Sequence, residues 1–313
     1  MRFGFGTLIV LALLVPGASG QAKKWTAPRT ADGQPDIGGF WTYATLTPLE
    51  RPAELAGKAT LTPEEAAEFA KQTVDRVSTD RRDGGGAADV GRSYNEFWRD
   101  RGSVVKTMRT SLIVDPPDGK VPALTPDGQK REAARAELAR LHPADGPENR
   151  NTWERCLGRG LPLVPSSYNN NFQIVQTPGY VVILLEMVHD ARIIPLDGSP
   201  HLPSNVRSWL GDSRGHWEGN TLVVDVTNFI EGANFRGSDK NLHLIERFTR
   251  VDAETLQYEF TVDDPTTFTK PWTASIPAIA TSDKIYEYAC NEGNFAMSGI
   301  LGGARADEKA AAK

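Results

Sequence analysis

Residues 211–215, GDSRG, have the spacing G-x-S-x-G, which is the sharpest chemical pattern in the chain. In a nucleophile elbow this motif joins an apolar strand to a helix, so that the turn exposes the serine hydroxyl and the helix amides stabilise an oxyanion. Here Ser204–Leu210 precede the motif, and His216 and Trp217 lead into a turn and a strand. The flanking residues therefore favour a polar loop over the elbow of a serine hydrolase.

A serine hydrolase also needs a carboxylate and a histidine beside Ser213. Asp225 or Asp239, followed by His243, supplies the chain order Ser, Asp, His. A short motif matches by chance, and chain order alone fixes no geometry. A nucleophilic Ser213 and an inert loop serine are therefore the two alternatives, and the flanking residues favour the second.

A second cluster, Glu186, His189, Asp190 and Arg192, follows the apolar run 180–185. If alternate residues of that run face a barrel interior, His189 lies on the same face at the end of the strand, and the other three residues point away. An imidazole at a cavity mouth can act as general acid or base near neutral pH. The alternative is a histidine hydrogen-bonded at a sheet edge, beside an ordinary surface pair of Asp190 and Arg192.

These two clusters define one candidate enzyme, a cofactor-independent lyase or hydrolase. A histidine is its general base, a carboxylate orients that histidine, and an arginine stabilises negative charge. The candidate catalytic residues are His189, Asp190, Arg192, Asp212, Ser213, Arg214 and His216. The hypothesis predicts that at least two of these groups face one pocket within hydrogen-bond distance.

Aromatic and amide side chains near predicted loops and strand ends form a candidate ligand site. Its residues are Tyr168, Asn170, Trp209 and Trp217. Ring stacking and amide hydrogen bonds at the rim of a cavity suit a sugar or an aromatic compound. The alternative is that the tryptophans close the ends of a small β core.

Neither a metal site nor a nucleotide cofactor is predicted. The five histidines form no H-x-H or H-E-x-x-H pair, and the two cysteines are too far apart for a C-x-x-C clip. No G-x-G-x-x-G or Walker loop occurs. The net charge is −5 without a basic run, so nucleic acid is not an expected partner, because phosphate binding relies on clustered cations.

Residues 1–20 predict export. Arg2 gives a positive start, Phe3 to Val15 is apolar, and small residues at 18–20 offer a cleavage site. A membrane anchor, the alternative, needs about 20 apolar residues. We therefore expect a signal peptide over 1–20, and a soluble mature protein without a membrane span in the periplasm or outside the cell.

An oxidising compartment favours a disulfide between the two cysteines, Cys156 and Cys290. Two buried free thiols are the alternative, because sequence does not supply the Cα separation that a disulfide requires.

We expect one main domain with an elaborated N-terminal part. An extended arm and a helical region over 21–150 pack on an antiparallel β domain over 151–302, and 303–313 form a disordered tail. Two Thr-Pro pairs predict helices over 63–77 and 125–141, because Thr caps free backbone amides and Pro fits the first helical position.

Short strands predict the fold class. In residues 255–262, TLQYEFTV, apolar and polar side chains alternate, so that one face is expected to be buried in the core and the other exposed to solvent. A hairpin is expected over 172–188 around a Thr-Pro-Gly turn, and the arm has one short strand near Phe40 and Trp41. Successive short strands with tight turns favour a mainly β protein, an antiparallel barrel or sandwich with a lipocalin-like strand pattern.

Two motifs, DGQPDIGGFW at 32–41 and WEGNTLVV at 217–224, resemble an uncharacterised family of secreted bacterial proteins. Two further segments also match motifs of that family: residues 263–268, DDPTTF, and the Pro-Trp pair at 271–272. The resemblance covers most of the mature chain. It implies membership of that family and supplies no activity or catalytic residues.

Three functions fit these observations. The first is an exported β-barrel protein that binds a small apolar or aromatic molecule in a closed interior cavity with few ionisable groups. The second is the cofactor-independent enzyme. The third is an envelope interaction protein that binds through its Pro-rich arm and flat sheet surfaces and has a filled core without a pocket. Amphipathic strands without a catalytic signature rank binding first.

Overall fold

The computed structural model describes residues 25–81, 84–86, 92 and 95–312. The predicted signal peptide, residues 1–20, lies outside this part of the chain, so export stays a prediction. Within the described ranges, no helix combines the length and the apolar character needed to cross a membrane.

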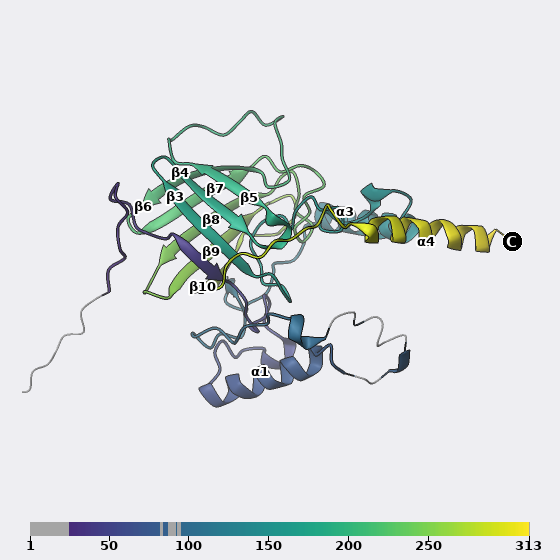
Figure 1. Ribbon diagram of the computed structural model, residues 1–313, viewed down its shortest axis with the longest axis horizontal. Helices are drawn as coiled ribbons and strands as arrows, with labels where there is room; N and C mark the ends of the chain where they lie inside the picture. Colours follow the sequence, from purple (N-terminus) through teal and green to yellow (C-terminus); the bar gives the residue numbers. More distant parts are fainter. Residues whose placement is uncertain (1–24, 82–83, 87–91, 93–94, 313) are drawn as a thin grey trace, which may run out of the picture.

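The described residues form one antiparallel sheet that curves into a nearly closed, lipocalin-like barrel, which confirms the predicted fold class (Figure 1). Nine strands follow one another in the order β5-β4-β3-β1-β10-β9-β8-β7-β6, and β2 also pairs with β10. The strands are β1 (Gly39–Thr42), β2 (Ile113–Asp115), β3 (Asn171–Thr177), β4 (Tyr180–Leu185), β5 (Ala191–Pro195), β6 (Asp212–Glu218), β7 (Thr221–Thr227), β8 (His243–Arg250), β9 (Thr255–Asp263) and β10 (Trp272–Ala280). The helices are α1 (Pro63–Val77), α3 (Pro126–Leu141) and α4 (Phe295–Ala311), with short 3-10 helices η1 (Ala53–Leu55), η2 (Glu96–Trp98), η3 (Pro147–Asn149) and η4 (Met187–His189).

Strict alternation along β9 builds the barrel interior. Leu256, Tyr258, Phe260 and Val262 are each at most 1% exposed, which confirms the predicted two-faced strand. Trp272 on β10 packs edge-on against Phe260, with ring centroids 5.7 Å apart. Aromatic rings therefore occupy the interior beside β9 and β10.

The N-terminal arm contributes a strand to the barrel. Its predicted strand near Phe40 and Trp41 is β1, which lies between β3 and β10. Trp41 pairs with Phe172 on one side and Ala280 on the other, and it is 1% exposed. The arm thus closes the sheet between two segments that are far apart in the sequence.

Both predicted helices form where their capping residues indicated. Thr62 accepts a hydrogen bond from the Glu65 amide, and the Glu65 carboxylate accepts one from the Thr62 amide, which completes a capping box for α1. Thr125 accepts from the Gly128 amide at the start of α3. In Figure 1, α1 lies beside the barrel rather than across its sheet.

The C-terminal prediction needs a correction. Residues 303–311, expected as part of a disordered tail, belong to α4, which extends away from the barrel in Figure 1. Asn294 caps this helix, and Arg305 donates hydrogen bonds to the carbonyls of Ala144 and Asp145. These long-range contacts attach the helix to residues 144–145, and the local sequence pattern did not predict them.

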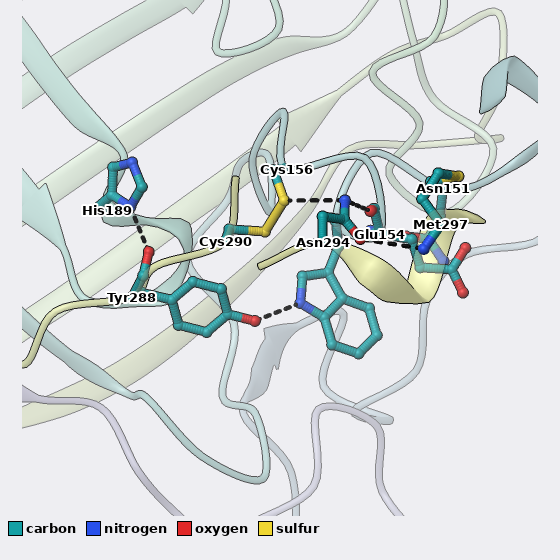
Figure 2. Close-up of a disulfide and its surroundings, with 9 residues drawn as sticks. Asn151, Glu154, Cys156, His189, Tyr288, Cys290, Asn294 and Met297 are labelled. Atoms are coloured by element: carbon teal, nitrogen blue, oxygen red, sulfur yellow. Dashed lines mark hydrogen bonds between the residues drawn. A yellow bond between two sulfur atoms is a disulfide. The ribbon is translucent and has the colours of Figure 1, made fainter. Parts of the chain in front are cut away.

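The predicted disulfide between Cys156 and Cys290 is confirmed, with a Cα separation of 5.7 Å (Figure 2). It joins the segment after β10 to the loop before β3, across 134 positions of the sequence.

Candidate functional site

The candidate site lies at the open seam of the barrel, between β5 and β6. These are the two end strands of the sheet, and no ladder joins them among the described residues. Unpaired strand edges need cover, and side chains supply it here. Gly215 on β6 has no side chain, and a Cβ there would lie 2.6 Å from Leu196 and 2.8 Å from Ile194. The apolar side chains of the β5 end therefore pack directly on the β6 backbone.

A polar contact crosses the same seam. Arg192 and Ile194 are the buried residues of β5, so Arg192 points into the barrel. Its Nη2 donates a hydrogen bond to Ser213 Oγ on β6, over 3.0 Å. Ser213 and Gly215 share the inner face of β6, because strand residues alternate.

Arg192 continues into a buried ionic network. Its Nη1 and Nη2 donate to the two carboxylate oxygens of Glu246 on β8, over 3.2 and 2.6 Å. The Tyr258 hydroxyl donates to the same carboxylate over 2.7 Å and accepts from the Leu163 amide over 3.1 Å. Burial and the adjacent Glu246 hold the pKa of Tyr258 well above its ordinary value, so the phenol keeps its proton and acts as a donor.

Burying this ionic network has a large unfavourable free energy. The Arg192 and Glu246 side chains are 2% and 0% exposed, and removing two charges from water costs several kcal/mol per ion before pairing offsets it. Arg192 Nε is also buried and has no hydrogen-bond partner among the described residues. A buried charge pair with a spare donor beside a cavity marks a candidate functional site.

A pocket of about 410 Å³ opens at this seam. Its lining residues are Leu157, Ala191, Arg192, Ile193, Pro195, Ser208, Trp209, Leu210, Gly211, Asp212, Ser213 and Arg214. Leu157, Trp209 and Leu210 give it an apolar wall, and Arg192 and Ser213 give it polar groups. The volume lies within the range of small-molecule sites, about 300–1,000 Å³.

The second arginine of the pocket is already paired. Arg214 Nη1 donates to Asp212 Oδ1 over 2.7 Å, and its Nε donates to the Pro200 carbonyl over 3.0 Å. Both side chains lie on the outer face of β6. Arg214 thus fixes the loop before β6, whereas Arg192 has a buried Nε without a hydrogen-bond partner among the described residues.

The structure brings together five residues that the sequence singled out. They are Arg192, Trp209, Asp212, Ser213 and Arg214, and all line the seam pocket. One orientation was wrong, since Arg192 was expected on the outer face of its strand and lies inside. The reason is that η4 separates β4 from β5, so alternation does not run through 185–192.

His189 does not reach the interior, which corrects the sequence expectation. Strand β4 ends at Leu185, and Val188 and His189 have φ values of +61° and +47°, so the chain turns before His189. The imidazole is exposed, and its Nδ1 donates to the Tyr288 carbonyl over 2.7 Å (Figure 2). Asp190 accepts from the Arg159 amide over 3.3 Å, and burial raises its pKa.

The remaining predicted residues lie away from the seam pocket. His216 is exposed on β6 and contacts Glu218, whereas Trp217 is half-buried against the core. Asn170 is fully buried, and it holds its loop by accepting from the Ser166 amide over 2.7 Å. Tyr168 lies under the Arg99 guanidinium at another groove.

Residues 211–215 do not form a nucleophile elbow, as the flanking sequence indicated. Ser213 lies within β6 and pairs in register with Val226 on β7. Asp225 and His243 contact each other over 2.7 Å, but Asp225 shares the outer face with Arg214. Ser213 faces the other way, so these three residues do not assemble as a triad.

Sequence reasoning missed Glu246 and Tyr258 as site residues. A signal existed for Glu246, because it lies between Leu244 and Phe248 on the apolar face of β8. A carboxylate on such a face requires a buried partner. Tyr258 carried no comparable signal, since a core tyrosine is ordinary.

No group of His, Cys, Asp or Glu side chains within the described ranges is suited to hold a metal ion. Comparison of the chain with protein-family models and with curated proteins returns no match.

Proposed function

We propose that the protein, like the secreted family that its motifs resemble, is exported, and that it binds a small apolar or aromatic molecule at the seam between β5 and β6. Arg192 receives an acidic or other acceptor group of that molecule. One observation carries the proposal: an apolar wall of Leu157, Trp209 and Leu210 meets a buried arginine with an unused Nε donor in one pocket. Pockets of this composition orient ligands through a few polar groups and bind them through apolar area.

The same geometry favours binding over catalysis. The enzyme hypothesis predicted at least two candidate groups in one pocket within hydrogen-bond distance, with a histidine as the general base. Arg192 and Ser213 meet within hydrogen-bond distance, but His189 and His216 lie outside the pocket. No histidine is among the residues that line the pocket, so a general base that takes up a proton near neutral pH is missing from that lining.

The binding site differs from the closed interior cavity first expected. Aromatic rings occupy the interior beside β9 and β10, and the pocket lies where the sheet fails to close. Arg192 lines this pocket, so a ligand bound there would lie beside the Arg192 network.

Nuclear magnetic resonance with 2-naphthoate as the probe tests the proposal. The indole N–H resonance of Trp209, identified by its loss in Trp209→Phe, should shift saturably as the probe is added. Trp209→Ala should weaken binding about tenfold, because it removes one wall of the pocket. Trp25→Ala is the matched control, since Trp25 is 37% exposed and lies outside the pocket.

The charge of the probe tests the role of Arg192. 2-Naphthoate should bind about tenfold more tightly than 2-naphthylmethylammonium, because a guanidinium prefers a carboxylate. Equal affinity for the two probes would remove Arg192 from the proposal. A Trp209 resonance that neither probe shifts at millimolar concentration would overturn the seam site itself.

A further inference from the structure

A second, larger groove lies where strands β1, β3, β4 and β10 begin or end, and it shares no lining residue with the seam pocket. It has a volume of about 1070 Å³ and runs between the segment after β10, the loop before β3 and η2. This groove is independent of the proposed function.

Five aromatic side chains line the groove: Phe97, Trp98, Tyr168, Tyr286 and Tyr288. Phe97, Trp98 and Tyr286 are 81%, 63% and 69% exposed, although large aromatic side chains are usually buried. Exposed apolar side chains gathered in one place mark an interaction site. Phe97 and Trp98 also pack edge to face on each other, with ring centroids 5.1 Å apart, and both remain largely exposed.

Amides and carboxylates lie between these rings. Asn169 and Asn171 contribute amides, which both donate and accept hydrogen bonds, whereas the Asn294 amide is already bonded to Glu154 and Met297. Of the described residues that line the groove, four carry a carboxylate and one, Arg99, carries a positive charge. The Arg99 guanidinium lies over the Tyr168 ring, 5.6 Å from its centroid. The excess of carboxylates disfavours an acidic ligand.

Covalent and polar contacts hold the groove in shape. The disulfide between Cys156 and Cys290 fixes its C-terminal wall (Figure 2). Tyr288 is held at both ends: its carbonyl accepts from His189 over 2.7 Å, and its hydroxyl accepts from the Trp153 indole over 3.2 Å. The side chain of His189, once a candidate base, therefore positions a groove residue.

Glu186 joins the groove to the barrel. Glu186 is 2% exposed, and its carboxylate accepts from the amides of Tyr286 and Asn171, both over 3.3 Å. One side chain thus ties the segment after β10 to the first residue of β3. A groove with such fixed walls is preformed, which lowers the entropy cost of binding.

We propose that this groove binds a neutral oligosaccharide. Pyranose rings present apolar C–H faces, which fit the exposed faces of Trp98 and Tyr286. Their hydroxyl groups donate to carboxylates and exchange hydrogen bonds with the amides of Asn169 and Asn171. A basic peptide would also satisfy the carboxylates and the amides, but it would not present a rigid apolar ring face to the exposed aromatic side chains.

Isothermal titration with three neutral hexasaccharides, cellohexaose, maltohexaose and chitohexaose, tests the proposal. At least one should bind, and Trp98→Ala or Tyr286→Ala should weaken that binding about tenfold through loss of a stacking face. Trp25→Ala and Tyr180→Ala are matched controls, because these residues are 37% and 46% exposed and lie outside the groove. Both controls should bind like the unchanged protein.

Two further measurements separate this groove from the alternatives. Trp209→Ala should leave oligosaccharide binding unchanged, so failure of the seam site does not affect this proposal. If none of the three sugars binds, or if Trp98→Ala and Tyr286→Ala bind like the controls, the proposal is wrong. Binding of hexalysine in their place, with loss in the same two variants, would assign the groove to basic peptides and overturn it.

Discussion

Arg192 on β5 and Glu246 on β8 form a doubly hydrogen-bonded ion pair inside the barrel, with side chains 2% and 0% exposed. Arg192 also donates to Ser213 on β6, the other end strand of the sheet. One side chain therefore links both edges of the seam to a strand across the interior. The closure of the barrel at this point depends on a polar contact, not on a ladder of backbone hydrogen bonds.

Replacement of one partner of this pair should be severe. Arg192→Met leaves the Glu246 carboxylate buried and uncompensated, and we expect the free energy of unfolding to fall by about 3–5 kcal/mol. The double variant Arg192→Met with Glu246→Leu should recover most of that loss, because no charge remains in the interior. Urea unfolding monitored by circular dichroism measures both.

A surface pair provides the control for this experiment. Arg247 on the outer face of β8 contacts Glu218 over 2.8 Å and is 40% exposed. Arg247→Met should change stability by less than about 1 kcal/mol. A double variant as unstable as Arg192→Met alone would show that the network stabilises by shape and not by charge pairing.

The disulfide should contribute strongly to stability. Cys156 and Cys290 are separated by 134 positions, and closing so long a loop reduces the entropy of the unfolded chain. We expect Cys156→Ala with Cys290→Ala to lower the free energy of unfolding by about 3–5 kcal/mol. Addition of a reductant should shift the unfolding midpoint of the unchanged protein and leave that of the double variant in place. Equal midpoints for the two proteins would contradict this prediction.

Gly215 should tolerate no side chain. A methyl group there meets Leu196 and Ile194 at less than 3 Å, so Gly215→Ala should destabilise the protein by about 1–3 kcal/mol through overpacking of the seam. Gly302→Ala is the matched control, since nothing lies within 4 Å of its Cβ position in α4. Alanine favours a helix interior, so this change should stabilise by about 0.5–1 kcal/mol. Thermal unfolding distinguishes the two, and a neutral Gly215→Ala would mean that the seam is loosely packed.

The fold was largely predictable, because its signals are local. The alternation of 255–262 fixed one buried face, and the Thr-Pro pairs fixed both helix starts by supplying caps for free amides. The helix α4 was missed because it rests on contacts such as those from Arg305 to Ala144 and Asp145. Such contacts join segments about 160 positions apart, and no local pattern encodes them.

The site was only partly predictable, and His189 shows why. Alternation places a residue only while a strand continues, and a turn with positive φ at Val188 and His189 interrupts it. The same turn restarts the alternation so that Arg192 points inward. The burial of Glu246, in contrast, could be predicted, because its charge lies on an apolar strand face. The sequence alone did not identify Arg192 as the cation that pairs with it.

A polar chain on the outer face of the barrel joins four side chains. Asp225 contacts His243 over 2.7 Å and His201 over 2.8 Å, and His201 also contacts Asp212 over 2.9 Å. The hydrogen bond that His243 donates to the Asp225 carboxylate raises the pKa of His243 and lowers the pKa of Asp225. Asp263, 3.9 Å from His243 Nδ1, acts in the same direction on the histidine.

These shifts predict how stability depends on pH. Because the folded pKa of His243 is raised, its contribution is complete below the unfolded value of about 6.5 and is lost as pH rises through the folded pKa. Because the folded pKa of Asp225 is lowered, its contribution is present above about 3.9 and is lost as pH falls through the folded pKa. The pair therefore stabilises most between these limits.

His243→Gln tests this dependence by urea unfolding at a series of pH values from 5 to 9. The variant should lose the decline in the free energy of unfolding that His243 causes on the alkaline side. The difference should stay below about 1 kcal/mol, because His243 and Asp225 are 36% and 38% exposed and solvent screens the pair. Asp225→Asn should flatten the same part of the profile at least as much, because it also alters the contact with His201. The double variant should flatten it no further than Asp225→Asn alone, since the interaction with His243 is already gone. Parallel profiles for the unchanged protein and His243→Gln would show that His201 and Asp212, not His243, hold Asp225 in place.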